Sequence, residues 1–360
     1  MRRIDVDVLL FLKEREREIV RERDIRRIRE MERESNNNMT LSCSFVMTRS
    51  VWSYNLESEF ELIRSIISLY PFISMDTEFP GVVFRSHPAF RQLNNNYVVM
   101  KANVDGMHLI QVGLTLSDGH DNLPTFGTSN RFIWEFNFCE FDVTHHPHDP
   151  HSIALLRRQG IDFDKNPKFG VSIVRFAELM MFSGLLCNNN IQWIAFHGAY
   201  DFGYMVKILS QRFFYMQPFL PPNLCDFLQL VKFFFGYKVY DVKHLIRFFP
   251  NLHGGLDKVS ESLGLDNSCR KSHQAGSDSL VTLHVFNKIK TLFSYRVGLT
   301  KTCRCSVWLG DNTHKLDDFV IVLSFCFVFF YFIFILYTNY QNFQFKMYDS
   351  INLLGILLKH

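Results

Sequence analysis

The stretch PFISMDTEFPGVVFR, residues 71–85, decides the fold and carries the first candidate functional residues. An apolar run ends in Asp76 and Glu78 and resumes after Pro80-Gly81. Because residues two apart on a strand point to the same face, the two acids would lie side by side at the end of a buried strand. Carboxylates held that close repel one another unless a cation lies between them, and such oxygen ligands suit Mg or Mn. Two solvated acids at a strand edge are the plainer alternative for this triplet alone.

The segments around this strand predict an α/β fold. A helical period of apolar residues covers residues 56–70. Further strands are expected at residues 81–84, 109–116, 131–138, 191–196 and 238–240. Helices are expected at residues 98–107, 152–158, 174–185, 202–209, 224–235, 242–248, 256–263 and 273–290. Strands come early and helices dominate later, which is typical of a mixed sheet with helices on its faces.

The composition divides the chain into three parts. Residues 1–50 are a charged extension with Arg-Glu repetition, which predicts disorder or a solvated helix. Residues 51–290 form the globular domain, and residues 291–360 form a divergent tail. Within the tail, residues 319–337 carry no charge and are long enough to cross a bilayer as a helix. This segment is a C-terminal anchor, a buried or disordered tail, or an artefact of the gene model.

Composition and charge argue against several kinds of protein. The 39 basic and 36 acidic residues give a net charge of +3, which is too mild to indicate nucleic acid by itself. The eight cysteines are scattered without a C-x-x-C, so we expect free thiols in a reducing compartment and no structural zinc. The apolar run at residues 8–12 is too short for a signal peptide. Four His among residues 145–151 could bind a metal, although a solvated surface loop is the commoner role for such a run.

Two further acids follow apolar segments. Asp201 comes after the expected strand at residues 191–196, and Asp278 lies five residues after His273. Four carboxylates converging on one pocket would require divalent metal. Two metals roughly 3.5–4 Å apart favour in-line displacement at phosphorus, since one lowers the pKa of a water and the other steadies the leaving oxygen. A nearby His can take the proton of that water. Taken singly, Asp201 fits a helix N-cap, Asp278 an exposed helix residue and His273 a satisfied loop residue.

Long blocks of sequence surround these residues. They include SMDTEFPGVVFR (74–85), LIQVGLTLSD (109–118), FIWEFNF (132–138), YDFGYMVKIL (200–209), LHGGLDKVSESLG (252–264) and HQAGSDSLVT (273–282). The order Asp-x-Glu, Asp, His-x4-Asp resembles the DEDD exonucleases of the variant with a catalytic His. The blocks are similar to the Caf-type deadenylase subunit of the Ccr-Not complex, in a plant-like form, from about residue 51 to residue 290.

This resemblance implies a ribonuclease-H-like mixed sheet flanked by helices, the DEDD exonuclease fold. It implies 3′-to-5′ removal of poly(A) from mRNA with release of 5′-AMP, by two divalent metal ions, Mg or Mn. Asp76, Glu78 and Asp278 would hold one metal, Asp76 and Asp201 the second, and His273 would be the general base. The implied partners are the poly(A) RNA 3′ end, the Not scaffold and a leucine-rich-repeat nuclease subunit, in nucleus and cytoplasm.

Three other functions stay open from the sequence. The first is a non-catalytic adaptor that keeps the fold and partner surface, which the five intact site residues argue against because like charges held together cost stability. The second is a membrane-tethered protein organised by residues 319–337. The third is another DEDD exonuclease with a short-oligonucleotide or DNA substrate, which the long matching blocks argue against. No strongly basic groove is visible, and this fits an enzyme recruited by partners.

Overall fold

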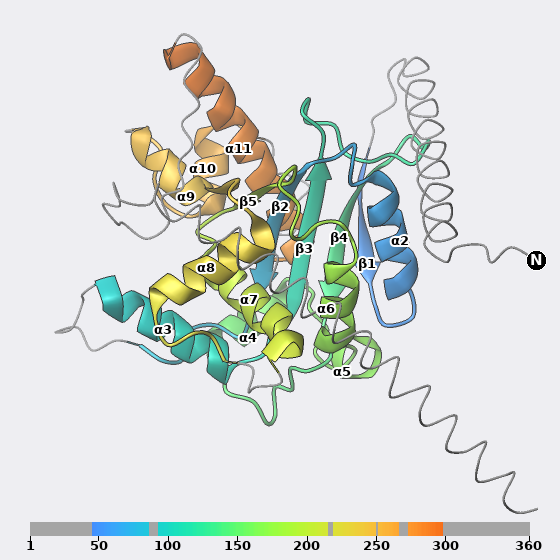
Figure 1. Cartoon of the computed structure of the whole chain (residues 1–360), viewed down its shortest axis with the longest axis vertical. Coiled ribbons are helices and arrows are strands. Elements are labelled where there is room, and N and C mark those ends of the chain that lie inside the picture. Colours follow the sequence, from blue (N-terminus) through green and yellow to red (C-terminus); the bar gives the residue numbers. More distant parts are fainter. Residues whose placement is uncertain (1–44, 86–92, 215–218, 250, 266–272, 298–360) are drawn as a thin grey trace, which may run out of the picture. The chain divides into compact units, whose positions relative to one another are not determined.

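The computed structural model describes residues 45–85, 93–214, 219–249, 251–265 and 273–297 (Figure 1). Most of the expected charged extension and the tail from residue 298 onward lie outside the described residues, and so does the apolar segment 319–337. Among the helices within the described ranges, none has both the length and the apolar character that a membrane span needs.

The described residues build a mixed six-stranded sheet in the order β1-β4-β3-β2-β5-β6. Strand β3 is antiparallel to both of its neighbours, β2 and β4, and the remaining pairs of strands are parallel. The strands are β1 (Val46–Val51), β2 (Phe72–Glu78), β3 (Gln111–Ser117), β4 (Arg131–Asn137), β5 (Gln192–Ala195) and β6 (Val239–Asp241). The predicted α/β fold with a mixed sheet flanked by helices is confirmed.

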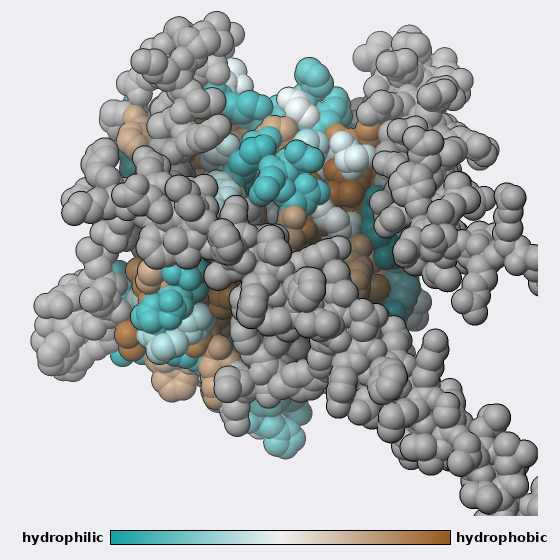
Figure 2. Space-filling view, in the orientation of Figure 1, coloured by the Kyte–Doolittle hydropathy of each residue, from teal (hydrophilic) through white to brown (hydrophobic). Residues whose placement is uncertain are grey.

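Helices cover both faces of this sheet (Figure 1). They are α2 (Leu56–Ile66), α3 (Leu93–Gly106), α4 (Pro150–Arg158), α5 (Asn166–Phe169), α6 (Ile173–Met181), α7 (Ala199–Phe214), α8 (Leu224–Phe235), α9 (Val242–Leu245), the 3-10 turn η2 (Ile246–Phe248), α10 (Leu256–Ser262) and α11 (Ala275–Val297). One buried apolar cluster joins the sheet to α2, α3, α6, α7 and α8, and a second joins it to α9, α10 and α11. Figure 2 shows hydrophilic and hydrophobic residues side by side on the described surface of one face.

Alternation along β2 and β3 gives the sheet an apolar face under α7 and a face of small and polar residues under α11. On β2, Ile73 and Met75 belong to the cluster with α7, whereas Ser74 and Asp76 point to the face that α11 covers. On that face of β3, Thr115 exchanges a 2.7 Å hydrogen bond with Ser279 of α11. Small and polar residues on this face of both strands therefore let α11 lie close against the sheet.

Two local predictions need correction. The sheet begins at Val46, inside the range assigned to the charged extension, because β1 pairs with β4 as an edge strand in which polar and apolar residues are mixed. The strand expected at residues 81–84 is absent from the sheet. There the backbone N–H groups of Val83 and Phe84 donate to Oδ1 of Asn103 at 2.8 and 2.9 Å. A side chain of α3 thus takes the hydrogen bonds that a neighbouring strand would have taken.

Candidate metal centre

The acids of β2 stand at the end of that strand, on the face that α11 covers. Asp76 and Glu78 are both half-buried and point to the same side, while Thr77 between them is buried and points to the opposite side. The register of the sheet places Asp76 opposite Gly113, and Glu78 opposite Gln111, on β3. The prediction that the two acids lie side by side at the end of a strand is confirmed.

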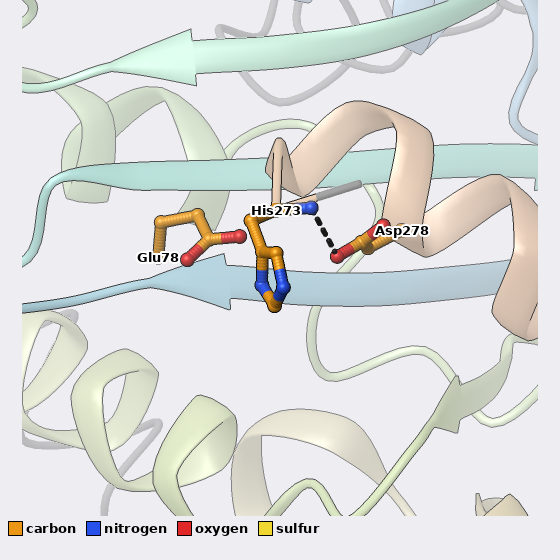
Figure 3. Close-up of side chains that lie close together, drawn as sticks. All are labelled: Glu78, His273 and Asp278. Atoms are coloured by element: carbon orange, nitrogen blue, oxygen red, sulfur yellow. Dashed lines mark hydrogen bonds between the residues drawn. The ribbon is translucent and has the colours of Figure 1, made fainter. Parts of the chain in front are cut away.

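The start of α11 brings His273 and Asp278 to these acids. His273 has a positive φ of 56° just before the helix, and its backbone N–H donates to Oδ2 of Asp278 at 3.1 Å. Ligand atoms of Glu78, His273 and Asp278 lie within 4.8 Å of one another (Figure 3). Three of the five predicted site residues therefore meet at one point, although they come from two distant parts of the chain.

The fourth acid approaches β2 from the other face of the sheet. Asp201 lies in the first turn of α7 and is only 6% exposed. Its Oδ1 accepts a 2.6 Å hydrogen bond from Oγ1 of Thr77, the residue between the two acids of β2. The helix N-cap considered for Asp201 is not its position, because the helix begins two residues earlier at Ala199. The hydrogen bond fixes this carboxylate beside the end of β2.

Burial and mutual repulsion raise the pKa values in this cluster. Loss of hydration raises the pKa of Glu78 well above its ordinary value, and the charges of Asp278, Asp201 and Glu135 raise it further. Burial likewise raises the pKa of Asp201 to about 7, with a contribution from the charge of Asp241, although the hydrogen bond from Thr77 opposes the change. The surroundings of these carboxylates thus disfavour their ionised forms, and a divalent cation would reverse that preference.

Two buried side chains that the sequence interpretation missed hold the N-terminus of α11. The N–H of Ala275 donates to Oε1 of Gln111 at 3.4 Å, and the N–H of Gly276 donates to Oε2 of Glu135 at 3.3 Å. Gly113 lies beneath them, where an added Cβ would come within 1.8 Å of the carbonyl oxygen of Ala275. The available signal was a polar residue inside each apolar run, in LIQVGL and FIWEFNF. These contacts fix where α11 presents His273 and Asp278.

The histidine run at residues 145–151 makes local contacts. Nδ1 of His145 lies 2.8 Å from Oδ2 of Asp142, and Nδ1 of His146 accepts the backbone N–H of Asp142 at 3.0 Å. Across the described ranges, the Glu78 cluster is the one group of three or more ligand atoms close enough to hold a metal. The run thus has the contacts of a surface loop, and no metal site is formed by its described residues.

Comparison with known proteins places the chain in a family. The model of the CAF1 family ribonucleases matches residues 51–184. The chain is 48% identical over 252 residues to the probable CCR4-associated factor 1 homolog 10 of Arabidopsis thaliana, covering 70% of this chain and 88% of the relative. It is 39% identical over 246 residues to the poly(A) ribonuclease pop2 of Schizosaccharomyces pombe, covering 68% and 70%.

Solved structures agree with the sequence comparison. The Mg²⁺- and Mn²⁺-bound form of S. pombe Pop2p superposes with a TM-score of 0.61 at 38% identity, over 68% of this chain and 92% of that one. The yeast CAF1 structure determined with the NOT1 MIF4G domain gives 0.57 at 33% identity, over 71% and 93%. The predicted resemblance is confirmed, and the chain belongs to the CAF1 family of ribonucleases.

Proposed function

We propose that the chain is a metal-dependent 3′-to-5′ exoribonuclease that removes poly(A) from mRNA and releases 5′-AMP. The observation that carries this proposal is the convergence of Glu78, His273 and Asp278 within 4.8 Å at the end of β2. Asp201 joins the same strand end through its hydrogen bond with Thr77. Membership of a ribonuclease family and the similarity to a poly(A) ribonuclease of fission yeast support the choice of reaction and substrate.

The residues present fit divalent cations. Asp76, Glu78, Asp201 and Asp278 supply hard oxygen ligands. Burial first, and neighbouring negative charge after it, raise the pKa values of Glu78 and Asp201, and a bound cation would oppose both effects. Asp76, Glu78 and Asp278 would hold one ion, and Asp76 with Asp201 the second. When bound, the ions would neutralise the charge of the carboxylates and polarise the phosphodiester. The similarity to the Mg²⁺- and Mn²⁺-bound form of Pop2p supports this assignment.

His273 is the residue that we assign to proton transfer. A ring nitrogen of a neutral imidazole can take a proton from the attacking water. The backbone N–H of His273 is held by Oδ2 of Asp278, which leaves the ring as the part of the residue that faces the acids (Figure 3). A base fixed in this way supports hydrolysis, because it lies beside the acids that would hold the cations and could take the proton of a water there.

An aromatic surface adjoins the acids and suits a nucleotide chain. The ring of Phe79, directly after Glu78, stacks on the ring of Tyr200 with centroids 5.0 Å apart and planes 14° apart. Tyr200 itself directly precedes Asp201, and the ring of the buried Tyr204 lies with its centroid 5.2 Å from that of Phe79. Base stacking on aromatic rings is tolerant of sequence and supports single-stranded nucleic acid binding without a strongly basic groove.

We infer the partners of this chain from its relatives. A yeast CAF1 protein was crystallised with the NOT1 MIF4G domain, which supports docking of this chain to a Not scaffold. A leucine-rich-repeat nuclease as second partner, and action in nucleus and cytoplasm, are further proposals. Exposed apolar side chains are available for such contacts among the described residues, including Phe182, Phe219 and Tyr237.

The test is the shortening of a 5′-labelled RNA that ends in a run of A residues. The full chain is incubated with Mg²⁺, with Mn²⁺ and with a chelator, beside Asp76→Ala and Asp278→Asn variants. Asp278→Asn keeps an oxygen that can accept the N–H of His273, so it removes charge with little change of structure. We expect stepwise 3′ shortening that needs metal and is lost in both variants. A folded, metal-supplied wild-type chain that leaves the RNA intact would favour the adaptor.

A further inference from the structure

The turn that joins β5 to α7 contains a residue with an unfavourable backbone conformation, close to the acids in the sequence. His197 is exposed and has a positive φ of 62°, although it bears a Cβ. Residues other than glycine seldom adopt this conformation, and the surrounding structure must hold them in it. Asp201, an acid assigned to metal, follows four residues later in the first turn of α7. The conformation at His197 therefore decides where α7 begins and where it presents Asp201.

The carboxylate of Asp241 holds this turn from the neighbouring strand. Strand β6 lies beside β5, and Asp241 at its end lies opposite Ala195 (Figure 1). Oδ1 of Asp241 accepts the backbone N–H of His197 at 3.1 Å, and Oδ2 accepts that of Gly198 at 3.2 Å. The two oxygens of one carboxylate thus bind two successive N–H groups. Hydrogen bonds to an ionised group are stronger than neutral ones, so they can offset the unfavourable conformation of His197.

The turn packs closely against the strand before it and the helix after it. A Cβ added at Gly198 would lie 2.5 Å from Cβ of Ala195 and 3.2 Å from the ring of Phe202. The backbone N–H of Phe202 also donates to the carbonyl oxygen of Gly198 at 3.0 Å. A displacement of the turn would therefore be passed on to the first turn of α7, which contains Asp201.

Asp201 is thus fixed from two sides. Oγ1 of Thr77 donates to its carboxylate from β2, and the turn held by Asp241 fixes its backbone. Burial is the main cause of the raised pKa of Asp201, and the charge of Asp241 adds to it, so the two carboxylates lie near each other. Three backbone N–H groups already occupy the oxygens of Asp241, which favours a supporting role over that of a metal ligand.

A helix N-cap is the plainer role for Asp241. Its Oδ1 also accepts the N–H of His244 at 3.3 Å, which is the N-cap bond of the four-residue helix α9. That bond is the longest of the three, and it leaves Oδ2 unused. The side chains of Asp149 and Asn223, which cap α4 and α8, bond within the first turn of their own helices. The two bonds from Asp241 to the turn after β5 are therefore additional to capping.

We propose that Asp241 is a positioning residue for the second metal site, because it holds the turn at His197 in the left-handed conformation that places Asp201 beside the end of β2. The proposal rests on the exoribonuclease function and the two metal ions proposed above. Asp241 acts through the backbone of the turn, so its loss should weaken the binding of one ion more than that of the other.

The test is a titration of the full chain with Mn²⁺, in which electron paramagnetic resonance separates free from bound ions. We expect the wild-type chain to bind two ions, and Asp241→Ala to bind one of them about ten- to hundredfold more weakly. The matched control is Asp118→Ala, which should leave both affinities unchanged. Asp118 also accepts two backbone N–H groups, beside the positive φ of Asp121, but it follows the end of β3 that is remote from the acids.

A second substitution separates positioning from charge. Glycine adopts a positive φ without strain, so His197→Gly added to Asp241→Ala should recover about three- to tenfold of the lost Mn²⁺ affinity. Asp241→Asn keeps one oxygen for the N–H of His197 and should lose less affinity than the alanine variant. A pure charge effect would weaken binding equally in both variants, and glycine would not restore it. That result, or wild-type affinity in folded Asp241→Ala, would overturn the proposal.

RNA shortening gives an independent measurement. At a Mn²⁺ concentration that saturates the wild-type chain, Asp241→Ala should lower kcat about ten- to hundredfold and leave KM for RNA unchanged. A loss confined to KM would contradict the proposal. If the alanine variant does not fold, Asp241→Asn with and without His197→Gly decides in the same way. A wild-type chain that binds Mn²⁺ without shortening RNA would refute the proposed function, and the titration would still decide the role of Asp241.

Discussion

Replacing Asp201 by Asn is expected to stabilise the metal-free protein while abolishing its activity. The carboxylate is only 6% exposed, and burial raises its pKa from 3.8 to about 7. The folded protein therefore binds this proton more tightly than the unfolded chain does. Stability is lost as the pH rises from about 4 to 7, and the loss is complete above the folded pKa. The Asn side chain removes the charge and can still accept the hydrogen bond from Thr77.

The magnitude follows from the two pKa values. Their difference of about three pH units corresponds to about 4 kcal/mol at most, since one unit is worth 1.36 kcal/mol. Neighbouring acids share part of this effect, so we expect a gain of about 2–4 kcal/mol for Asp201→Asn at pH 8 in chelator. Below about pH 4 the carboxyl group is protonated in both states, and the gain should vanish.

The assay is urea unfolding of the full chain, followed by tryptophan fluorescence at pH 4, 6 and 8. Asp164→Asn serves as control, because Asp164 is an exposed acid. Addition of Mn²⁺ at pH 8 should stabilise the wild-type chain more than the Asp201→Asn variant, since the variant lacks one ligand. A difference in unfolding free energy that is the same at pH 4 and pH 8 would refute the reasoning.

Substitutions at three further residues test contacts that support the site and the fold. Gly113→Ala should cost about 2–4 kcal/mol of unfolding free energy and weaken Mn²⁺ binding, because its Cβ would overlap the carbonyl of Ala275; unchanged binding by titration calorimetry would contradict this. Glu135→Gln keeps an acceptor for the N–H of Gly276, so RNA shortening should stay within about threefold of wild type, whereas Glu135→Leu should lose about 1–3 kcal/mol. Lys207→Met should lose about 2–4 kcal/mol in thermal unfolding, because Nζ of Lys207 donates to three backbone carbonyls at the end of α3.

The sequence predicted those features that follow from local patterns. The end of β2 was predictable, because an apolar run interrupted by Asp76 and Glu78 has the period of a strand with one polar face. Asp201 and Asp278 were candidates because they follow apolar segments, but only the family resemblance distinguished them and His273 from ordinary helix and loop residues. Their proximity depends on strand order, which places β2 at the centre of the sheet.

The features that escaped prediction depend on contacts between distant segments. The prediction of a strand at residues 81–84 was wrong. The side chain of Asn103, about twenty residues away, accepts the hydrogen bonds of the backbone in this segment. The start of β1 at Val46 was missed because polar and apolar residues are mixed there without a clear period, as an edge strand allows. The roles of Gln111 and Glu135 become visible only once α11 lies over the sheet, because each caps a helix more than 130 residues further on.

The most direct test of the central claim is the chemistry of the released product. The full chain is incubated with Mn²⁺ and an RNA ending in A residues in water enriched in ¹⁸O, and the mononucleotides are analysed by mass spectrometry. Hydrolysis at the 3′ end predicts 5′-AMP that carries one ¹⁸O atom in its phosphate, with no product in the Asp278→Asn variant. Release of adenosine 3′-phosphate, or of unlabelled product from the wild-type chain, would contradict the account.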